Sequence, residues 1–413
     1  MIPNYVRALV REIRLVGKAQ GLKAQGPRTQ DLSLWALGLD PCSTLFLGGG
    51  TPSLLPLSQL ALIFDALRDS FALTPDCEIT LEANPGTVDQ AYLEGLRALG
   101  VNRLSFGVQS AHPGELKLLD RLHTFDEVVL AVQWARAAGF DNLNLDLIFG
   151  IPHQTLAMWQ DTLTRVLALQ PDHLSCYALS LEHGTPLRSW VYRGLLPMPD
   201  SDLAAEMYEW ASEELERHGF GQYEISNWAK NGEQTTDDEG RKTDDRGSSS
   251  FVFRPSSSVA ESGLHPSSFI PHPFQCRHNL QYWRNLPYLG LGAGAHGYAA
   301  NWRYSNVLAP AAYIARLEEG GEVQFPFSPA VAETIQVTEE TAMGETMMMG
   351  MRLTCEGVRD QDFQKRFGVG LAERYSKELR RLKELKLIEW DDDGARLMKS
   401  GRLLGNRVFR EFV

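Results

Sequence analysis

The sequence predicts an α/β fold built around a parallel sheet. Short apolar runs that end in glycine, proline or a polar residue lie at 44–47, 77–81, 103–110 and 144–152. Segments long enough for a helix separate them, which is the pattern of repeated strand-helix units. A further run at 171–180 is expected to be the last strand.

The C-terminal region predicts a small separate domain. We expect a methionine-rich helix over 345–353, a second helix over 371–386 and a hairpin over 387–398. Methionines at this density more often fill a core than bind a cofactor. A helix followed by a hairpin is the winged-helix pattern, but glutamates between the basic residues of the second helix favour a solvated face over a DNA-binding one.

Composition limits the class of protein. The chain has 413 residues, a hydrophobic content of 43% and a formal charge of −12, which argues against broad nucleic-acid binding. No run of eighteen apolar residues suggests a membrane span. Unpaired, irregularly spaced cysteines agree with a reducing compartment, so we expect a cytoplasmic protein.

Two helices and one irregular segment complete the prediction. Apolar spacing predicts a helix over 1–13 and another over about 201–218. Segment 231–275 is first highly charged and then rich in Ser, Pro and His, which predicts a disordered insertion. Its His265 and His272 are expected to be solvated rather than metal ligands.

The loops after the strands carry the candidate functional residues, because such loops converge on one site in these repeats. The triple glycine of Gly48–Thr51 lets the backbone approach a ligand closely. Glu82, Gln109, Arg121 and Asp146 add two carboxylates, an amide and a cation, which suit a zwitterion joined to a ribose. Taken one at a time, each feature has a structural alternative. The glycines could form a plain tight turn, Asp146 could cap a helix and Arg121 could be a surface cation. Their order and spacing favour a site.

In this order and spacing, the motifs resemble the radical S-adenosylmethionine (SAM) family of oxygen-independent coproporphyrinogen III oxidases and their haem-chaperone relatives. The resemblance runs from Tyr5 to the C-terminus and is interrupted once. It implies a partial (β/α)6 barrel of the TIM type, followed by a winged-helix-like C-terminal domain. It also implies SAM and a [4Fe–4S] cluster as cofactors.

The resemblance assigns a role to each candidate residue. The glycine loop would hold the methionine part of the cofactor, four polar residues would supply the other contacts, and a serine would lie against the adenine. The loop residues are Gly49, Gly50 and Thr51. The four polar residues are Glu82, Gln109, Arg121 and Asp146, and the serine is Ser180.

The sequence departs from the family at its start. Family members begin with a strand and a Cys-x-x-x-Cys-x-x-Cys loop whose thiolates bind the cluster, whereas here Met1–Ile13 predicts the helix after that loop. The cysteines cannot replace the motif because they are scattered singly, at Cys42, Cys77, Cys176, Cys276 and Cys355. We expect a misassigned start codon rather than a cluster-less protein, and an unpaired edge on the strand that would follow the missing one.

A second informative stretch spans Cys276–Trp283. The haem-chaperone branch carries a His-Asn-x-x-Tyr-Trp motif to which haem binding has been attributed, so His278 is the candidate haem ligand. An imidazole beside aromatic rings could hold a porphyrin; the alternative is that His278 hydrogen-bonds in a loop while the rings pack. The glycine-rich run 289–298 is expected over the cofactor, and its His296 could line the same pocket.

These features divide the chain into four parts. They are the truncated radical SAM barrel at 1–230, the insertion at 231–275, a segment completing the core at 276–330, and the C-terminal domain at 331–413.

Three functions follow from the resemblance. The first is a chaperone that binds haem and SAM and transfers haem to acceptor proteins. The second is an oxidoreductase that decarboxylates coproporphyrinogen III by radical chemistry, and the third is a cluster-less remnant that only binds haem or cofactor. The motif around His278 favours the first, and whether the chain is an enzyme is left open. We expect no nucleic-acid partner and no membrane span.

Overall fold

The computed structural model describes residues 1–25, 41–232, 273–321 and 323–413 of the chain. Most of the predicted insertion, with His265 and His272, lies outside the described residues. No helix within the described ranges combines the length and the apolar character that a bilayer crossing requires.

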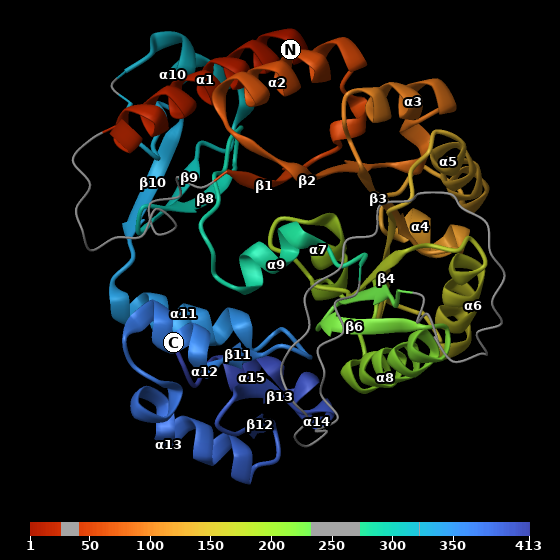
Figure 1. Ribbon diagram of the computed structural model, residues 1–413. Helices are drawn as coiled ribbons and strands as arrows, with labels where there is room; N and C mark the ends of the chain where they lie inside the picture. Colours follow the sequence, from red (N-terminus) through yellow and green to blue (C-terminus); the bar gives the residue numbers. More distant parts are fainter. Residues whose placement is uncertain (26–40, 233–272, 322) are drawn as a thin grey trace, which may run out of the picture.

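A seven-stranded curved sheet in the order β1-β2-β3-β4-β5-β7-β6 forms the largest layer (Figure 1). The first five strands run parallel to one another. Strand β7 is antiparallel to β5, and β6 is antiparallel to β7. The strands are β1 (Cys42–Leu47), β2 (Leu73–Ala83), β3 (Arg103–Gln109), β4 (Leu143–Phe149), β5 (His173–Ala178), β6 (Phe220–Glu224) and β7 (Asn227–Lys230).

The predicted partial barrel is confirmed, with one addition. The run at 171–180 contains the last parallel strand, β5, but it is not the last strand of the sheet. The hairpin of β6 and β7 extends the sheet, since β7 pairs with β5. This pairing is stabilised by Trp228 and Ala229 of β7, whose side chains are fully buried.

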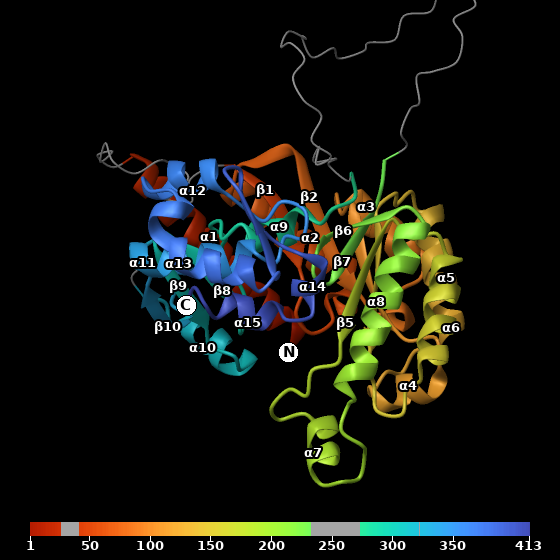
Figure 2. The same cartoon turned by 90° about the horizontal axis from the view of Figure 1, so that it is seen from below.

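Helices cover the outer face of the sheet (Figures 1 and 2). They are α2 (Leu57–Ser70), α3 (Gln90–Ala98), α4 (Pro113–Leu118), α5 (Phe125–Ala137), α6 (Leu156–Leu167) and α8 (Ser201–Arg217), with the turns η1 (Pro52–Leu54) and η2 (Pro85–Thr87). Figure 2 shows α7 (Pro186–Tyr192) projecting from one end. The main core lies between sheet and helices; α5, for example, starts at a capping box of Thr124 and Glu127 and buries Val128 and Val132.

A second layer adjoins the β1 end of the sheet (Figure 1). It contains α1 (Ile2–Gln25), α10 (Pro310–Glu319) and a three-stranded sheet of β8 (His296–Ala299), β9 (Trp302–Asn306) and β10 (Val331–Gln336). Buried Glu12 of α1 accepts hydrogen bonds from the Gly292 amide, Asn306, Tyr313 and Ser328. This carboxylate therefore fixes α1 against the glycine-rich loop and α10.

Helix α9 (Arg277–Trp283) lies within the concave side of the curved sheet (Figure 1). Its first turn is anchored by Glu78 of β2, whose carboxylate accepts the backbone N–H groups of Arg277 at 2.9 Å and His278 at 3.0 Å. A carboxylate satisfies the free N–H groups of a helix start and complements its dipole. The position of α9, and of His278 on it, thus depends on a residue almost 200 positions earlier.

The C-terminal domain has its own core, which includes Met347, Met351, Phe363 and Leu379. This confirms that the clustered methionines fill a core. The domain consists of α11 (Glu339–Gly350), β11 (Val358–Arg359), α12 (Asp360–Phe367), α13 (Leu371–Glu384), β12 (Ile388–Trp390), β13 (Gly394–Leu397), α14 (Lys399–Arg402) and α15 (Gly405–Phe409). The helix predicted at 345–353 begins earlier, because Thr338 caps its first turn.

Candidate functional site

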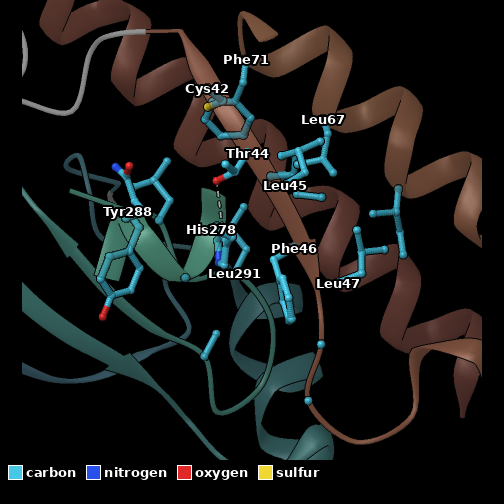
Figure 3. Close-up of a pocket in the computed structure, with 18 of the residues that line it drawn as sticks. Cys42, Thr44, Leu45, Phe46, Leu47, Leu67, Phe71, His278, Tyr288 and Leu291 are labelled. Atoms are coloured by element: carbon cyan, nitrogen blue, oxygen red, sulfur yellow. Dashed lines mark hydrogen bonds between the residues drawn. The ribbon is translucent and has the colours of Figure 1, made fainter. Parts of the chain in front are cut away.

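A cavity of about 710 Å³, which we call the edge pocket, lies beside β1 (Figure 3). Side chains from α1, β1, α2, α9 and the glycine-rich loop line it; they include Leu9, Leu45, Leu67, Phe71 and Leu291. No Asp, Glu, Lys or Arg is among its described lining residues. Among the described residues the edge pocket is therefore uncharged and mostly apolar, with a few polar groups such as Thr44 and Gln281.

His278 projects into the edge pocket from α9 (Figure 3). Its Nδ1 lies 2.9 Å from the Thr44 hydroxyl and its Nε2 lies 2.8 Å from the Tyr282 hydroxyl. Phe46 stacks on the imidazole with 4.9 Å between ring centroids, and Tyr288 packs edge-on against Tyr282. The ring is thus fixed in the plane that its two hydrogen bonds define.

The environment of His278 keeps its imidazole neutral. Burial, and secondarily the positive charge of Arg103, lower the pKa of His278 to about 4. A neutral imidazole with a defined orientation is the form that coordinates a metal ion.

A second cavity of about 500 Å³, the sheet pocket, opens onto the inner face of the large sheet. Alternate residues of a strand point to the same face, so Arg103 and Ser105 of β3 share it with Asn144 and Asp146 of β4. These four residues line the sheet pocket together with Ser175 and others. Outward-facing neighbours such as Leu104 instead enter the main core.

Asp146 is the centre of a hydrogen-bonded group in the sheet pocket. Its two carboxylate oxygens accept from the Ser105 hydroxyl at 2.9 Å and from the Asn144 amide at 2.8 Å. Burial raises the pKa of Asp146, while bonds from Ser175, Asn144 and Ser105 and the charge of Arg103 oppose that rise. The carboxylate can accept from a ligand hydroxyl or ammonium group.

The glycine loop and Glu82 join the two pockets. The Gly49 amide donates to Glu82 Oε2 at 3.1 Å, and Phe46 lines both cavities. Gly49 and Gly50 have φ of 79° and 72°, and an added Cβ at either would meet open space. Glycine is therefore needed for the backbone conformation, and it leaves the loop open to a ligand.

The predicted site residues are brought together in part. Glu82, Gln109, Asp146 and Ser180 line the sheet pocket. Gly49, Thr51, His278 and His296 line the edge pocket, while Gly50 lines neither. Arg121 is exposed in the loop after α4 and lines neither cavity.

The cysteines do not fit an iron-sulfur cluster. In the part of the chain that the structure describes, no three His, Cys, Asp or Glu side chains are grouped to hold a metal ion. Cys77, Cys176 and Cys276 are buried, Cys42 is half-buried and Cys355 is exposed. Burial raises the pKa of Cys77 to about 11 and that of Cys276 to about 12, so both stay protonated thiols at neutral pH.

Comparison with known proteins identifies the family. The Radical SAM superfamily model matches residues 34–166, and the HemN C-terminal domain model matches residues 337–404. The haem chaperone HemW of Bacillus subtilis is 34% identical over 377 residues, which covers 91% of this chain and 86% of that protein. The chain belongs to the HemW family of radical SAM proteins.

A second relative agrees with this assignment, and a solved structure shares the fold. The haem chaperone HemW of Mycobacterium tuberculosis is 33% identical over 389 residues, covering 93% of this chain and 84% of the HemW protein. The solved structure of coproporphyrinogen III oxidase (HemN) from Escherichia coli matches with a TM-score of 0.72 and 21% identity, covering 100% of this chain and 83% of HemN. At that identity the HemN match shows a shared fold.

Sequence reasoning missed several lining residues. Arg103 of the sheet pocket and Phe46, Thr44 and Tyr288 of the edge pocket were not predicted as site residues. Strand alternation was the available signal for Arg103, since it lies two residues before Ser105 and six before Gln109 on one strand. No comparable signal exists for Tyr288, which reaches the pocket from a distant loop.

Proposed function

We propose that this chain binds haem in the edge pocket, with His278 as the iron ligand, and transfers it to acceptor proteins. The observation that carries this proposal is a neutral imidazole on the wall of an apolar cavity without charged lining. Its HemW relatives are named haem chaperones, which supports the same function.

The edge pocket suits the chemistry of a porphyrin. The macrocycle is flat and apolar, and aromatic side chains such as Phe46, Tyr282 and Tyr288 offer matching faces. Because the cavity offers no cation, the charged propionates would remain at its mouth, where His296 is exposed.

Thr44 and Tyr282 prepare His278 for this role. When Nδ1 carries the proton, it donates to the Thr44 hydroxyl and Nε2 accepts from Tyr282. The Tyr282 side chain would have to move away for the Nε2 lone pair to reach iron, while Thr44 would keep the ring oriented.

We further propose that the sheet pocket takes SAM. Glu82, Gln109, Asp146 and Ser180 supply acceptors and donors for its ammonium and ribose groups. The loop of Gly49, Gly50 and Thr51, which is hydrogen-bonded to Glu82 through the Gly49 amide, would supply backbone contacts from outside this pocket. Arg121 is retained as a predicted contact, to be tested by Arg121→Ala. SAM supplies an adenosyl group when bound to a radical SAM protein, but the cysteines of this chain fit no cluster.

Coproporphyrinogen III oxidation is the second candidate, because the HemN fold matches the whole chain. It differs experimentally from haem transfer in that it consumes a porphyrinogen. If the protein binds and transfers haem but does not turn over a porphyrinogen, the oxidase function is excluded. If it binds haem but transfers none, the function that remains is that of a cluster-less binding protein. We propose a cytoplasmic location for the first of these functions.

A haem titration followed by Soret absorbance tests the proposal. We compare the parent protein with His278→Ala and with the matched variant His296→Ala, which removes another imidazole from the same pocket. His278→Ala should weaken haem binding by about 10- to 100-fold or more. Loss of a residue that only supports a metal ligand already lowers metal affinity by about 10- to 100-fold. Equal spectra and affinity for the parent and His278→Ala would contradict the assignment.

A further inference from the structure

Arg103 is a buried cation that the proposed functions leave unexplained. It lies at the start of β3, is only 2% exposed and ranks among the largest fully buried side chains. Its side chain nevertheless lines the sheet pocket, on the face shared with Ser105 and Asp146. A guanidinium here is thus shielded from bulk water and open to whatever occupies the cavity.

The guanidinium of Arg103 has no partner of its own within the described chain. Its buried Nε makes no hydrogen bond, and no carboxylate forms an ion pair with it. Glu78 and Asp146 act on it electrostatically, but both carboxylates are committed elsewhere. Glu78 accepts from the start of α9, and Asp146 accepts from Ser105 and Asn144.

Three partly buried arginines differ from Arg103 because each has a carboxylate partner. Arg303 forms an ion pair with Glu345 at 2.7 Å, Arg284 pairs with Glu356 at 2.6 Å, and Arg136 pairs with an aspartate at 2.8 Å. Burying a cation without a hydrogen-bonded anion is strongly unfavourable. Nearby groups, Glu78 and Asp146 among them, offset the burial of this cation electrostatically, so what Arg103 offers a ligand at the cavity wall is a set of hydrogen-bond donors without partners in the described chain.

We propose that Arg103 is the anion-binding residue of the sheet pocket and receives a carboxylate of the bound molecule. The planar guanidinium matches a carboxylate in a two-bond fork, and the neighbouring Ser105 and Asn144 offer further polar contacts. Without this cation, Glu82 and Asp146 would repel any anionic ligand, whereas with it the pocket is complementary to a zwitterion.

This inference rests on the proposed ligands in one respect, namely the source of the carboxylate. It is the amino-acid carboxylate of SAM, the ligand proposed for this pocket, or a propionate of a porphyrin, which would place the porphyrin in the sheet pocket rather than the edge pocket. Two pairs of probes separate these sources: SAM against decarboxylated SAM, and haem against haem dimethyl ester. Each pair differs in the carboxylate and keeps the rest of the molecule.

The experiment measures the affinity of the full chain for all four probes by calorimetry or absorbance. The parent should prefer the carboxylate-bearing member of one pair by about 10- to 100-fold, the range expected for a charge-assisted hydrogen-bonded pair. Arg103→Gln should remove that preference. Arg103→Lys keeps the charge but not the fork, so it should retain part of the preference.

A matched control and a stability readout separate binding from folding. Arg303→Gln removes an arginine that already has a carboxylate partner, so it should lower the melting temperature and leave the probe preference unchanged. The melting temperature of ligand-free Arg103→Gln is measured beside its probe preference, because the variant also removes the attraction of this cation to Glu78 and Asp146.

The outcomes are distinct. A parent preference that survives in Arg103→Gln, or a fall in melting temperature with no change in preference, overturns the role of Arg103 alone. If the parent binds no member of either pair, both this inference and the proposed function fail. Loss of preference in the SAM pair or in the haem pair supports the inference and identifies the source of the carboxylate.

Discussion

The two cavities lie on either side of Phe46, yet they differ in almost every chemical property. The edge pocket has no charged lining residue within the described chain, and its oriented polar groups include the neutral imidazole of His278 with its partners Thr44 and Tyr282. The sheet pocket contains Glu82, Arg103 and Asp146 in a smaller volume. Two cavities of different chemistry therefore share one aromatic side chain, Phe46.

The difference arises from how each cavity is built. The sheet pocket is formed by one face of parallel strands, so residues two apart on a strand fall into it together. The edge pocket is formed by contacts between distant segments, with α9 held against β2 by Glu78 and against β1 by the Thr44–His278 hydrogen bond. A local sequence pattern can therefore indicate the first cavity but not the second.

The largest expected effect comes from placing a charge in the apolar cavity. Leu291→Glu should reduce haem affinity by more than about 100-fold, because an unpaired buried carboxylate costs several kcal/mol. SAM affinity should stay unchanged. The measurement is a pair of titrations, with Leu308→Glu at an 82% exposed position as the control. If the two variants bind haem equally, haem does not occupy the edge pocket.

The reciprocal change concerns the sheet pocket. Asp146→Asn should weaken SAM binding by about 10-fold, since it removes the charge from a hydrogen bond to a cationic or hydroxyl group. Haem affinity should change by less than about 2-fold, because the carboxylate does not line the edge pocket. Equilibrium dialysis with SAM and a haem titration measure both. An unchanged SAM affinity would remove Asp146 from the site.

Prediction from the sequence succeeded where a property repeats along the chain. The strand-helix units, the methionine-filled core of the C-terminal domain and the hairpin at its end all have local periodicity, and the structure contains them. Of the site residues, Glu82, Gln109 and Asp146 lie in one cavity because they belong to neighbouring parallel strands, although Asp146 lies in the middle of β4 and not at its end. Arg121, which lies in a longer loop, is not brought to that cavity.

The sequence also predicted an unpaired strand edge, and β1 has no strand partner on its outer side within the described chain. It did not indicate that a cavity opens along this edge. A strand paired there would fill part of the edge pocket, so the volume available to a ligand depends on whether the edge is free. The antiparallel hairpin of β6 and β7 was missed because its strands are short and it follows a helix rather than a parallel strand.

A smaller effect is expected from Tyr282. Tyr282→Phe removes the hydroxyl that occupies His278 Nε2 and keeps the ring that packs against Tyr288. Haem affinity should rise by about 2- to 10-fold, the worth of one ordinary hydrogen bond. Absorbance titration of the variant beside Tyr288→Phe measures it. A loss of affinity would mean that the Tyr282 hydroxyl supports the ligand rather than competing with iron.

The smallest effect concerns pH. The folded protein holds the pKa of His278 near 4, whereas an unfolded histidine titrates near about 6.5. Below the unfolded pKa only the unfolded state takes up the proton, so stability is lost as pH falls from about 6.5 towards 4. Between pH 7 and pH 5 the free energy of unfolding should therefore decrease less in His278→Gln than in the parent, by on the order of 1 kcal/mol. This value is discounted because the side chain is partly exposed.

Urea unfolding at pH 7 and pH 5 measures this difference, with His218→Gln, which replaces an exposed histidine, as the control. If the parent and His278→Gln lose equal stability, the edge pocket does not exclude charge in the way its lining indicates.

The central claim is that the two cavities bind two different ligands at the same time. A haem titration of the protein with and without saturating SAM tests it most directly. The account predicts that haem affinity changes by less than about 2-fold and that both ligands are bound in the final complex. An apparent haem dissociation constant that rises in proportion to the SAM concentration, or the failure of either ligand to bind, would contradict it.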